Sequence, residues 1–428
     1  MRSWSQRVVA ALVALSGLPG PAWAVSSEVD ILLNKLVEKG VLSSIEAGQI
    51  RDEITQTKEA RTKEVAKEVV PKWAQQISLS GDLRLRTEHF QRDASTSNSS
   101  TRNRQRARLR VGLKAKVSDQ LEAGVRLATG TDGDPVSTNQ TAADIFDKKN
   151  IFLDQAYLKF TTTGTRLGAV PLTVWGGKFE NPFYSTQLVW DSDLTFEGAA
   201  ATLTPVIGPV EPFLAVGVFP VDELNPNGED PTIWGVQAGT VWHLAPDAAT
   251  EWAKALTVKG GLGYYDYKNL KHGIDTLSSN RFGNTAAEGS GAGTTVFAYD
   301  YNLLDLVGEI NTKLLGKPVL LYSDYVKNTA IADNDEGFEM GLKVGKADKP
   351  LAWEAGYTFT RLEPDAVVGQ FSNSDFGDGG TNRSGHAYYA AIGTLKNSTL
   401  GFKWSVTEAI DGTDLAIDRL QVDWNTKF

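Results

Sequence analysis

The chain has no cysteine among its 428 residues, and its four histidines lie on different segments. Without cysteine there is no disulfide framework, no thiolate catalysis and no zinc or iron–sulfur centre held by sulfur. The scattered histidines do not predict a catalytic triad. The formal net charge of -9 argues against nucleic acid as the main partner. We therefore expect a protein that is not an enzyme and has no catalytic, metal or cofactor site.

Long hydrophobic runs are also missing, which excludes a helical membrane anchor beyond the N-terminus. A transmembrane helix needs about 20 mostly apolar residues, and the apolar run at residues 8–18 is too short. Arg2 and Arg7 flank a short polar segment before this run, and Ala22-Trp23-Ala24 fits a small-x-small cleavage site. We expect residues 1–24 to be a signal peptide, cleaved after Ala24, that exports the chain.

Residues 25–71 carry the clearest helical pattern. Ile31, Leu32 and Leu36 follow helical spacing, Gly40 suits the end of a first helix, and Pro71 stops the second. The second helix is rich in Glu, Lys and Arg with a thin apolar stripe. We expect a periplasmic helical, coiled-coil-like region here. Its heptads are too few to fix an oligomer state, and a solvated helical spacer is an equal alternative.

From residue 77 onward the apolar period changes to two. In residues 104–116 basic side chains alternate with Leu109, Val111 and Leu113, and residues 77–90 repeat the pattern. Successive side chains of a strand point to opposite faces, so each strand has one basic face and one apolar face. A Lys or Arg facing lipid costs about 2–4 kcal/mol at the bilayer midplane. The basic face must therefore point to water, which in a closed barrel is the lumen.

Sixteen candidate strands follow this pattern. They are roughly 77–90, 104–117, 121–129, 151–161, 172–179, 194–203, 211–219, 232–243, 255–267, 303–314, 318–327, 336–346, 351–362, 386–395, 399–407 and 415–428. Tight turns such as 118–120 and 396–398 alternate with long loops rich in Gly, Ser, Asn and Asp. This asymmetry and an even strand count are typical of outer-membrane barrels. The sequence predicts an all-β fold, a 16-stranded antiparallel transmembrane β-barrel at residues 72–428, in outer-membrane lipid.

The chain resembles the putative porin family of Gram-negative outer membranes, within the general porin superfamily. The resemblance rests on ISLSGDLRLRTE, RARLRVGLKAKVSD, GGKFENPFYSTQLVWDSDLTFEG and NSTLGFKWS, and it covers nearly the whole mature chain. It implies a homotrimeric channel in the outer membrane that passes small hydrophilic solutes. The last strand, with Trp424 and terminal Phe428 on one face, is similar to the signal that the barrel-assembly machinery reads.

The resemblance also implies where the pore narrows. The loop after Phe179 is expected to fold inward as a constriction loop carrying Glu180, Tyr184, Asp191 and Asp193. Opposite it we expect a pore-lining basic wall: Arg84, Arg86, Arg104, Arg106, Arg108, Arg110 and Arg126, with Lys178 beside the loop. Rings of basic side chains favour anions, so we expect a weak anion preference.

Three alternatives stay open. Some of the arginines could pair with lumen carboxylates such as Asp82, Glu88 and Glu122 and merely solvate the wall. Phe183, Tyr184 and Trp190 could stack against sugars, although packing of the loop is the favoured interpretation. The barrel could also be a structural tether that binds peptidoglycan through the helical arm at residues 25–71.

Overall fold

The computed structural model describes residues 35, 38–39, 76–94, 97–143, 145–162, 170–223, 230–271, 281–288, 295–412 and 415–428. The chain divides into two units, Met1–Ser78 and Leu79–Phe428. In the first unit Lys35 and Glu38 are helical, and the backbone N–H of Lys39 donates to the carbonyl of Lys35 over 3.1 Å. The predicted signal peptide and nearly all of the predicted helical region lie outside the described residues. Among the described residues, no helix is long and apolar enough to cross a membrane.

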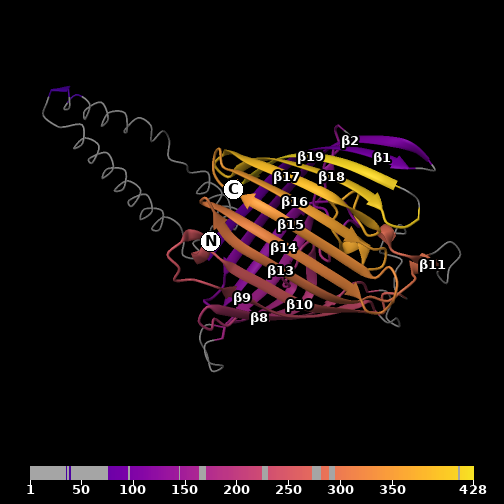
Figure 1. Ribbon diagram of the computed structural model, residues 1–428, viewed down its shortest axis with the longest axis horizontal. Coiled ribbons are helices and arrows are strands. Elements are labelled where there is room, and N and C mark those ends of the chain that lie inside the picture. Colours follow the sequence, from indigo (N-terminus) through magenta and orange to yellow (C-terminus); the bar gives the residue numbers. More distant parts are fainter. Residues whose placement is uncertain are drawn as a thin grey trace, which may run out of the picture. The chain divides into compact units, whose positions relative to one another are not determined.

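One large antiparallel sheet dominates the second unit (Figure 1). Its long strands are β1 (Ile77–Ala94), β2 (Ser97–Lys116), β3 (Leu121–Thr129), β5 (Ile151–Thr161), β6 (Leu172–Glu180), β7 (Thr195–Leu203), β8 (Val210–Pro220), β9 (Thr232–His243), β10 (Thr257–Lys268), β13 (Asn302–Leu314), β14 (Lys317–Asn328), β15 (Glu336–Gly345), β16 (Trp353–Leu362), β17 (Arg383–Leu395), β18 (Ser398–Ala409) and β19 (Leu415–Lys427).

The short elements lie in the connections between these strands. They are β4 (Gln140–Thr141), α4 (Glu251–Lys254), η2 (Arg281–Gly283), the hairpin of β11 (Ala286–Glu288) and β12 (Thr295–Phe297), and η3 (Gly369–Phe371). Within the described residues the sheet has 17 strands, of which β4 is only a two-residue bridge to β2. The sixteen long strands confirm the predicted strand number.

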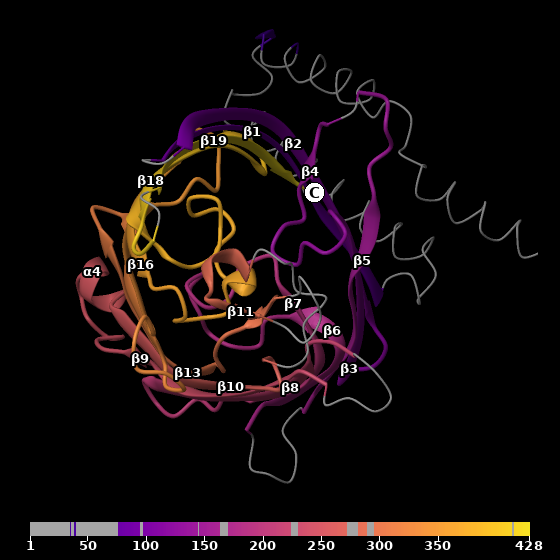
Figure 2. The ribbon, with the colours of Figure 1, turned by 90° about the vertical axis from the view of Figure 1, so that its right-hand side faces the viewer.

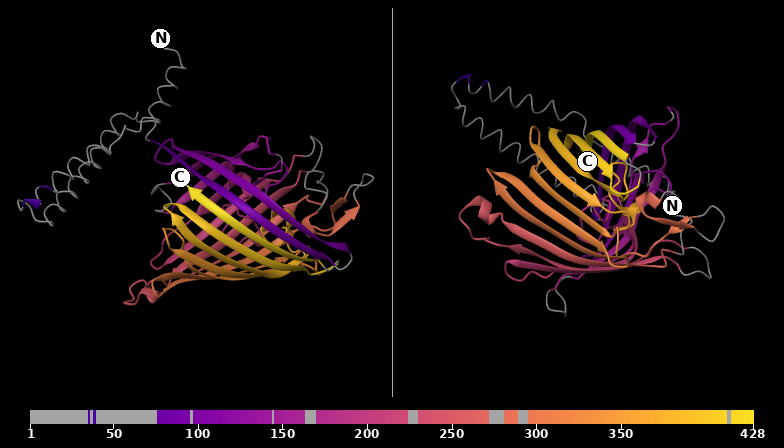
Figure 3. Two further views of the ribbon diagram at one scale, coloured as in Figure 1. Left: turned by 90° about the horizontal axis from the view of Figure 1, so that it is seen from above. Right: turned by 45° about the vertical axis from the view of Figure 1, so that its right-hand side comes forward.

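The sheet closes on itself between its first and last strands. β1 pairs with β2 on one side and with β19 on the other, from Asp82↔Lys427 to Ala94↔Leu415. Figure 3 shows these purple and yellow strands side by side. Below this ladder Gly81 and Phe428 exchange two backbone hydrogen bonds of 2.8 and 3.0 Å. A Cβ on Gly81 would lie 2.6 Å from the Phe428 ring, so the closing seam needs glycine there.

The two faces of the wall differ as the alternation predicts. Leu83 and Leu85 on β1 are 41% and 50% exposed, whereas Arg86 and Glu88, which follow them on the opposite face of the strand, are buried. The same contrast holds on β13, where Leu304 and Leu306 are exposed. In an outer-membrane barrel the exposed apolar face contacts lipid and the polar face lines the lumen.

Long loops fold into the barrel rather than away from it. Figure 2 looks along the barrel and shows magenta and orange segments inside the ring of strands. Loop 181–194, between β6 and β7, buries Phe183, Leu188 and Trp190 against inward aromatic side chains of β7, β8 and β10. Loop 363–382, between β16 and β17, adds Val367 and Val368 to the same hydrophobic cluster. The core of this barrel is therefore inside its lumen.

Candidate functional site: the lumen and its constriction

Loop 181–194 and loop 363–382 are joined inside the barrel through Asp191. The Asp191 carboxylate accepts hydrogen bonds from the backbone N–H groups of Asp193 (2.8 Å) and Ser374 (2.7 Å). Its own N–H donates to the carbonyl of Phe371 over 2.7 Å. Burial raises the pKa of Asp191 to about 6, although the two backbone donors oppose this shift. The predicted constriction loop thus has a second loop as its partner.

The predicted basic wall is assembled on β1, β2 and β3, and carboxylates neutralise most of it. Arg86 binds Asp375 and Asp423, Arg104 binds Glu88, Arg108 binds Asp82, Arg110 binds Asp82 and Asp193, and Arg126 binds Asp154 and Glu180. Five arginines of the wall therefore pair with carboxylates, as the first of the three alternatives suggests. Asp82 and Glu88 act as foreseen, whereas Glu122 accepts from the Tyr157 hydroxyl over 3.1 Å.

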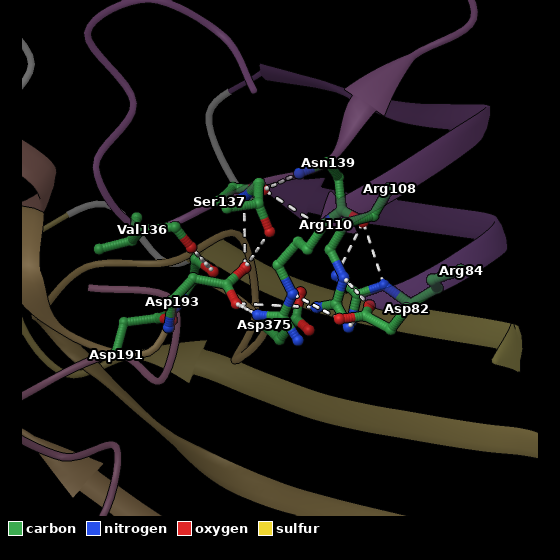
Figure 4. Close-up of polar contacts among 12 residues, drawn as sticks. Asp82, Arg84, Arg108, Arg110, Val136, Ser137, Asn139, Asp191, Asp193 and Asp375 are labelled. Atoms are coloured by element: carbon green, nitrogen blue, oxygen red, sulfur yellow. Dashed lines mark hydrogen bonds and ion pairs between the residues drawn. The ribbon is translucent and has the colours of Figure 1, made fainter. Parts of the chain in front are cut away.

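Arg84 and Arg106 differ from these five. Both converge on Asn139 of the loop after β3, Arg84 at its side-chain Oδ1 (2.7 and 3.1 Å) and Arg106 at its backbone carbonyl (3.1 Å). Arg106 also donates to the Ser137 hydroxyl, 3.2 Å away. Within the described part of the chain neither guanidinium has a carboxylate in ion-pair contact. Figure 4 shows Arg84 and Asn139 near the carboxylates that form ion pairs with Arg108 and Arg110.

Loop 363–382 supplies the counter-ion that the sequence analysis missed, Asp375. One of its oxygens lies 2.8 Å from Arg86 and 2.9 Å from Arg419, a basic residue of the last strand. Burial alone would raise the pKa of Asp375, but Arg86 and then Arg419 hold it well below its usual range. Arg419 lies on the polar face of its strand, so alternation could have identified it. A single aspartate in a Gly-, Ser- and Asp-rich loop carries no such signal.

Lys178 does not belong to the basic wall. Trp175 and Phe179 on the same strand pack against each other and the lumen cluster. Because successive side chains of a strand point to opposite faces, Lys178, directly before Phe179, points outward. The Lys178 ammonium lies 3.5 Å from Glu197, a carboxylate that is 68% exposed. On the neighbouring strand β5, Lys178 pairs with Ala156 and not with a residue that contacts the arginines.

The aromatic residues of loop 181–194 have two different surroundings. Phe183 and Trp190 are buried and meet Tyr265 edge-on at 5.0 and 5.2 Å between ring centres, so they pack the loop. Tyr184 faces the cavity instead: its hydroxyl donates to Glu309 over 2.9 Å, and Lys259 sits 3.5 Å above its ring. A sugar could reach only Tyr184 of these three.

A cavity of about 900 Å³ lies between loop 181–194 and the barrel wall. Arg86, Arg110 and Arg126 line one side, and Glu309, Glu339 and Glu354 line another. Glu180, the last residue of β6, is 71% exposed and lines the cavity together with Tyr184 at the start of loop 181–194. Charges of both signs thus face one water-accessible space, which is suited to polar solutes.

The two residues of the predicted assembly signal lie on the outer face at the closing seam. Trp424 is 52% exposed and pairs with Leu85 of β1, and Phe428 is 60% exposed over Gly81. Their rings are available to lipid or to another protein.

A closed antiparallel barrel with an apolar outer face and a polar lumen is the fold of an outer-membrane channel. The family model described as putative porin matches residues 92–291 and 294–428, so the chain belongs to this family and localises to the outer membrane.

The fold is similar to that of a solved porin structure, OprB. OprB of Pseudomonas putida is similar at 12% identity and a TM-score of 0.52, over 83% of this chain and 95% of that one. OmpF of Salmonella typhi, in complex with daunomycin, has 11% identity and a TM-score of 0.46 over 82% and 97% of the two chains. No curated protein matches the chain in sequence. At such low identities the likeness shows the fold alone.

Proposed function

We propose that the protein is a passive diffusion channel for small hydrophilic solutes and ions. The observation that carries this proposal is the cavity of about 900 Å³ beside loop 181–194, with charged and hydroxyl groups around it. A porin interior of sixteen strands is wide enough for water-filled passage. The family and fold are those of channel proteins rather than typical enzymes.

We also propose a weak preference for anions. Five arginines of the basic wall are neutralised by carboxylates. The positive electrostatic field of the wall is therefore weaker than the sequence alone suggests. Among the described residues, Arg84 and Arg106 meet only neutral acceptors on Asn139 and Ser137, so no carboxylate compensates their charges at contact distance there. Fixed positive charge in a narrow lumen raises the local concentration of anions.

Swelling of liposomes that contain the purified protein tests passive diffusion directly. In isosmotic solutions of neutral sugars the liposomes should swell, at rates that fall as the sugar becomes larger. Liposomes with heat-denatured protein serve as the control. A folded barrel that produces no swelling would contradict the channel.

A structural barrel tethered to peptidoglycan is the alternative function. The filling of part of the lumen by loops 181–194 and 363–382 favours it, because such packing narrows any path. The tether itself falls on residues 25–71, nearly all of which lie outside the described residues. It predicts no solute flux and a loss of cell-wall attachment when residues 25–71 are deleted.

The proposed partners are a second and third copy of the chain and the barrel-assembly machinery. The homotrimer rests on the family resemblance. Recognition by the assembly machinery is supported by the exposure of Trp424 and Phe428 at the seam where the barrel closes.

A further inference from the structure

Two aspartates lie side by side on the inner wall behind loop 181–194. Asp305 on β13 and Asp324 on β14 face inward, and the register places Asp305 opposite Val326 and Val307 opposite Asp324. Both side chains are fully buried, at 0% exposure, and their carboxyl groups are in contact. Neither belongs to the basic wall or to the predicted constriction set.

No cation among the described residues forms an ion pair with either aspartate. Among the described residues neither aspartate takes part in a salt bridge, and both oxygens of Asp305 and one of Asp324 have no hydrogen-bond donor. The titratable groups that face the pair are Tyr265 from β10, Tyr184 from loop 181–194, Tyr322 from β14 and Glu339 from β15. None of these carries a positive charge. Two touching carboxylates cannot both stay ionised without water or a counter-ion, so a shared proton is the cheapest solution.

The remaining oxygen of Asp324 holds the constriction loop. It accepts hydrogen bonds from the hydroxyl of Thr186 (2.5 Å) and from the backbone N–H of Thr186 (3.3 Å). The Thr186 hydroxyl in turn accepts from the N–H of Leu188 over 3.1 Å. Thr186 also lines the cavity, so a movement of this residue changes the shape of the lumen.

We propose that Asp305 and Asp324 share one proton and act as a latch that positions loop 181–194 against β13 and β14. The latch rests on the proposed channel function, which it would regulate. Loss of the shared proton at alkaline pH leaves two adjacent buried negative charges. Their repulsion, with Glu339 close by, separates the aspartates and releases Thr186. The two aspartates are positioning residues, since they act on the solute path through the loop.

The test is single-channel conductance of the full-length protein in a planar bilayer, measured from neutral to alkaline pH. The wild type should show a reversible change of conductance and open-channel noise as the pair loses its proton. Asp324→Asn and Asp305→Asn should both lose this transition and keep the neutral-pH conductance, because an amide donates to the remaining carboxylate. Glu211→Gln, on β8 beside His243, is the matched control and should keep the transition.

Thiol labelling supplies a readout of the loop itself, since the chain has no native cysteine. Leu188→Cys, a buried loop position, should react with a bilayer-impermeant thiol reagent much faster at alkaline pH in the wild-type background. With Asp324→Asn added, only the rise due to thiolate formation should remain. Equal labelling profiles in both backgrounds, or an alkaline transition that survives both Asp→Asn changes, would overturn the latch. A folded wild type with no conductance at any pH would refute the channel instead.

Discussion

The charge that a lumen arginine presents to a solute depends on the acceptor that its guanidinium meets. Arg108 lies 2.8 Å from Asp82 and 3.7 Å from Asp193, and a passing ion meets a neutral group there. In the described part of the chain, Arg106 on the same strand face meets only a hydroxyl and a carbonyl oxygen. Two side chains that are equivalent in the sequence pattern thus have different contacts, and we propose that they affect a passing ion differently.

Replacement of Arg106 should therefore shift ion selectivity without loss of the fold. Arg106→Gln removes a charge that no carboxylate contacts among the described residues, so the reversal potential in a salt gradient should move toward cation preference. Arg108→Gln leaves Asp82 and Asp193 partly unpaired and should instead lower the free energy of unfolding by about 3 kcal/mol. Lys178→Gln, on the outer face, is the matched control. A shift with Lys178→Gln as large as that with Arg106→Gln would contradict this assignment.

Asp191 should make the stability of the joined loops depend on pH. Its folded pKa of about 6 lies above the ordinary value, so the folded state holds the proton more tightly than the unfolded state. Stability should therefore rise as pH falls from about 7 to about 4, by roughly 2 kcal/mol. Thermal unfolding of the detergent-solubilised protein over this range measures it.

The control for this pH effect is Asp191→Asn, which cannot titrate and should flatten the rise. Asp375 interferes little above about pH 4, because a carboxyl with a depressed folded pKa starts to lose its stabilising contribution only as pH falls through the ordinary aspartate value. An unchanged pH profile in the Asn variant would contradict the role of Asp191.

Among the elements, loop 363–382 changes the picture of the lumen most. Arg86 and Arg419 bind its Asp375, Asn284 receives the N–H of Gly369 over 2.7 Å, and Val368 joins the apolar cluster. These polar contacts and the apolar packing together hold the loop inside the barrel.

Asp375→Asn should loosen this loop. The change removes one carboxylate from a network around two buried guanidinium groups, so we expect a loss of about 2–4 kcal/mol in the free energy of unfolding, together with noisier open-channel current. Asp348→Asn is the control, since the Asp348 pair with Lys346 is exposed on both sides and should cost less than about 1 kcal/mol. Equal effects of the two variants would argue against an anchoring role for Asp375.

The strands were predictable from sequence, whereas the path of this loop was not. Alternation along β1 and β2 assigns each side chain to lipid or lumen, because burying charge in lipid is costly. Loop 363–382 has the Gly-, Ser- and Asp-rich composition of an external loop, and only the apolar run at Ala366–Val368 hints that it is buried. Which acid meets which arginine depends on contacts between distant segments, such as Arg86 and Asp375, that periodicity does not encode.

At the scale of the whole molecule, the barrel has an apolar outside, a closed seam at Gly81 and Phe428, and an interior that is part packed core and part polar cavity. The packed side is built by loop 181–194 against β7–β10. The cavity lies between that loop and the charged walls. In the proposed channel, this division would place the solute path away from the aromatic cluster and beside the arginines that line the cavity.

Reversal potential and single-channel conductance of the purified protein, in a planar bilayer under a salt gradient, test this account most directly. A conducting channel with a weak anion preference is the predicted result, because no carboxylate among the described residues contacts Arg84 or Arg106, while the other five arginines of the wall are paired. A conducting channel that prefers cations would move the control of selectivity to carboxylates such as Glu180 and Glu309. A folded barrel that carries no current would contradict the channel and leave the structural tether.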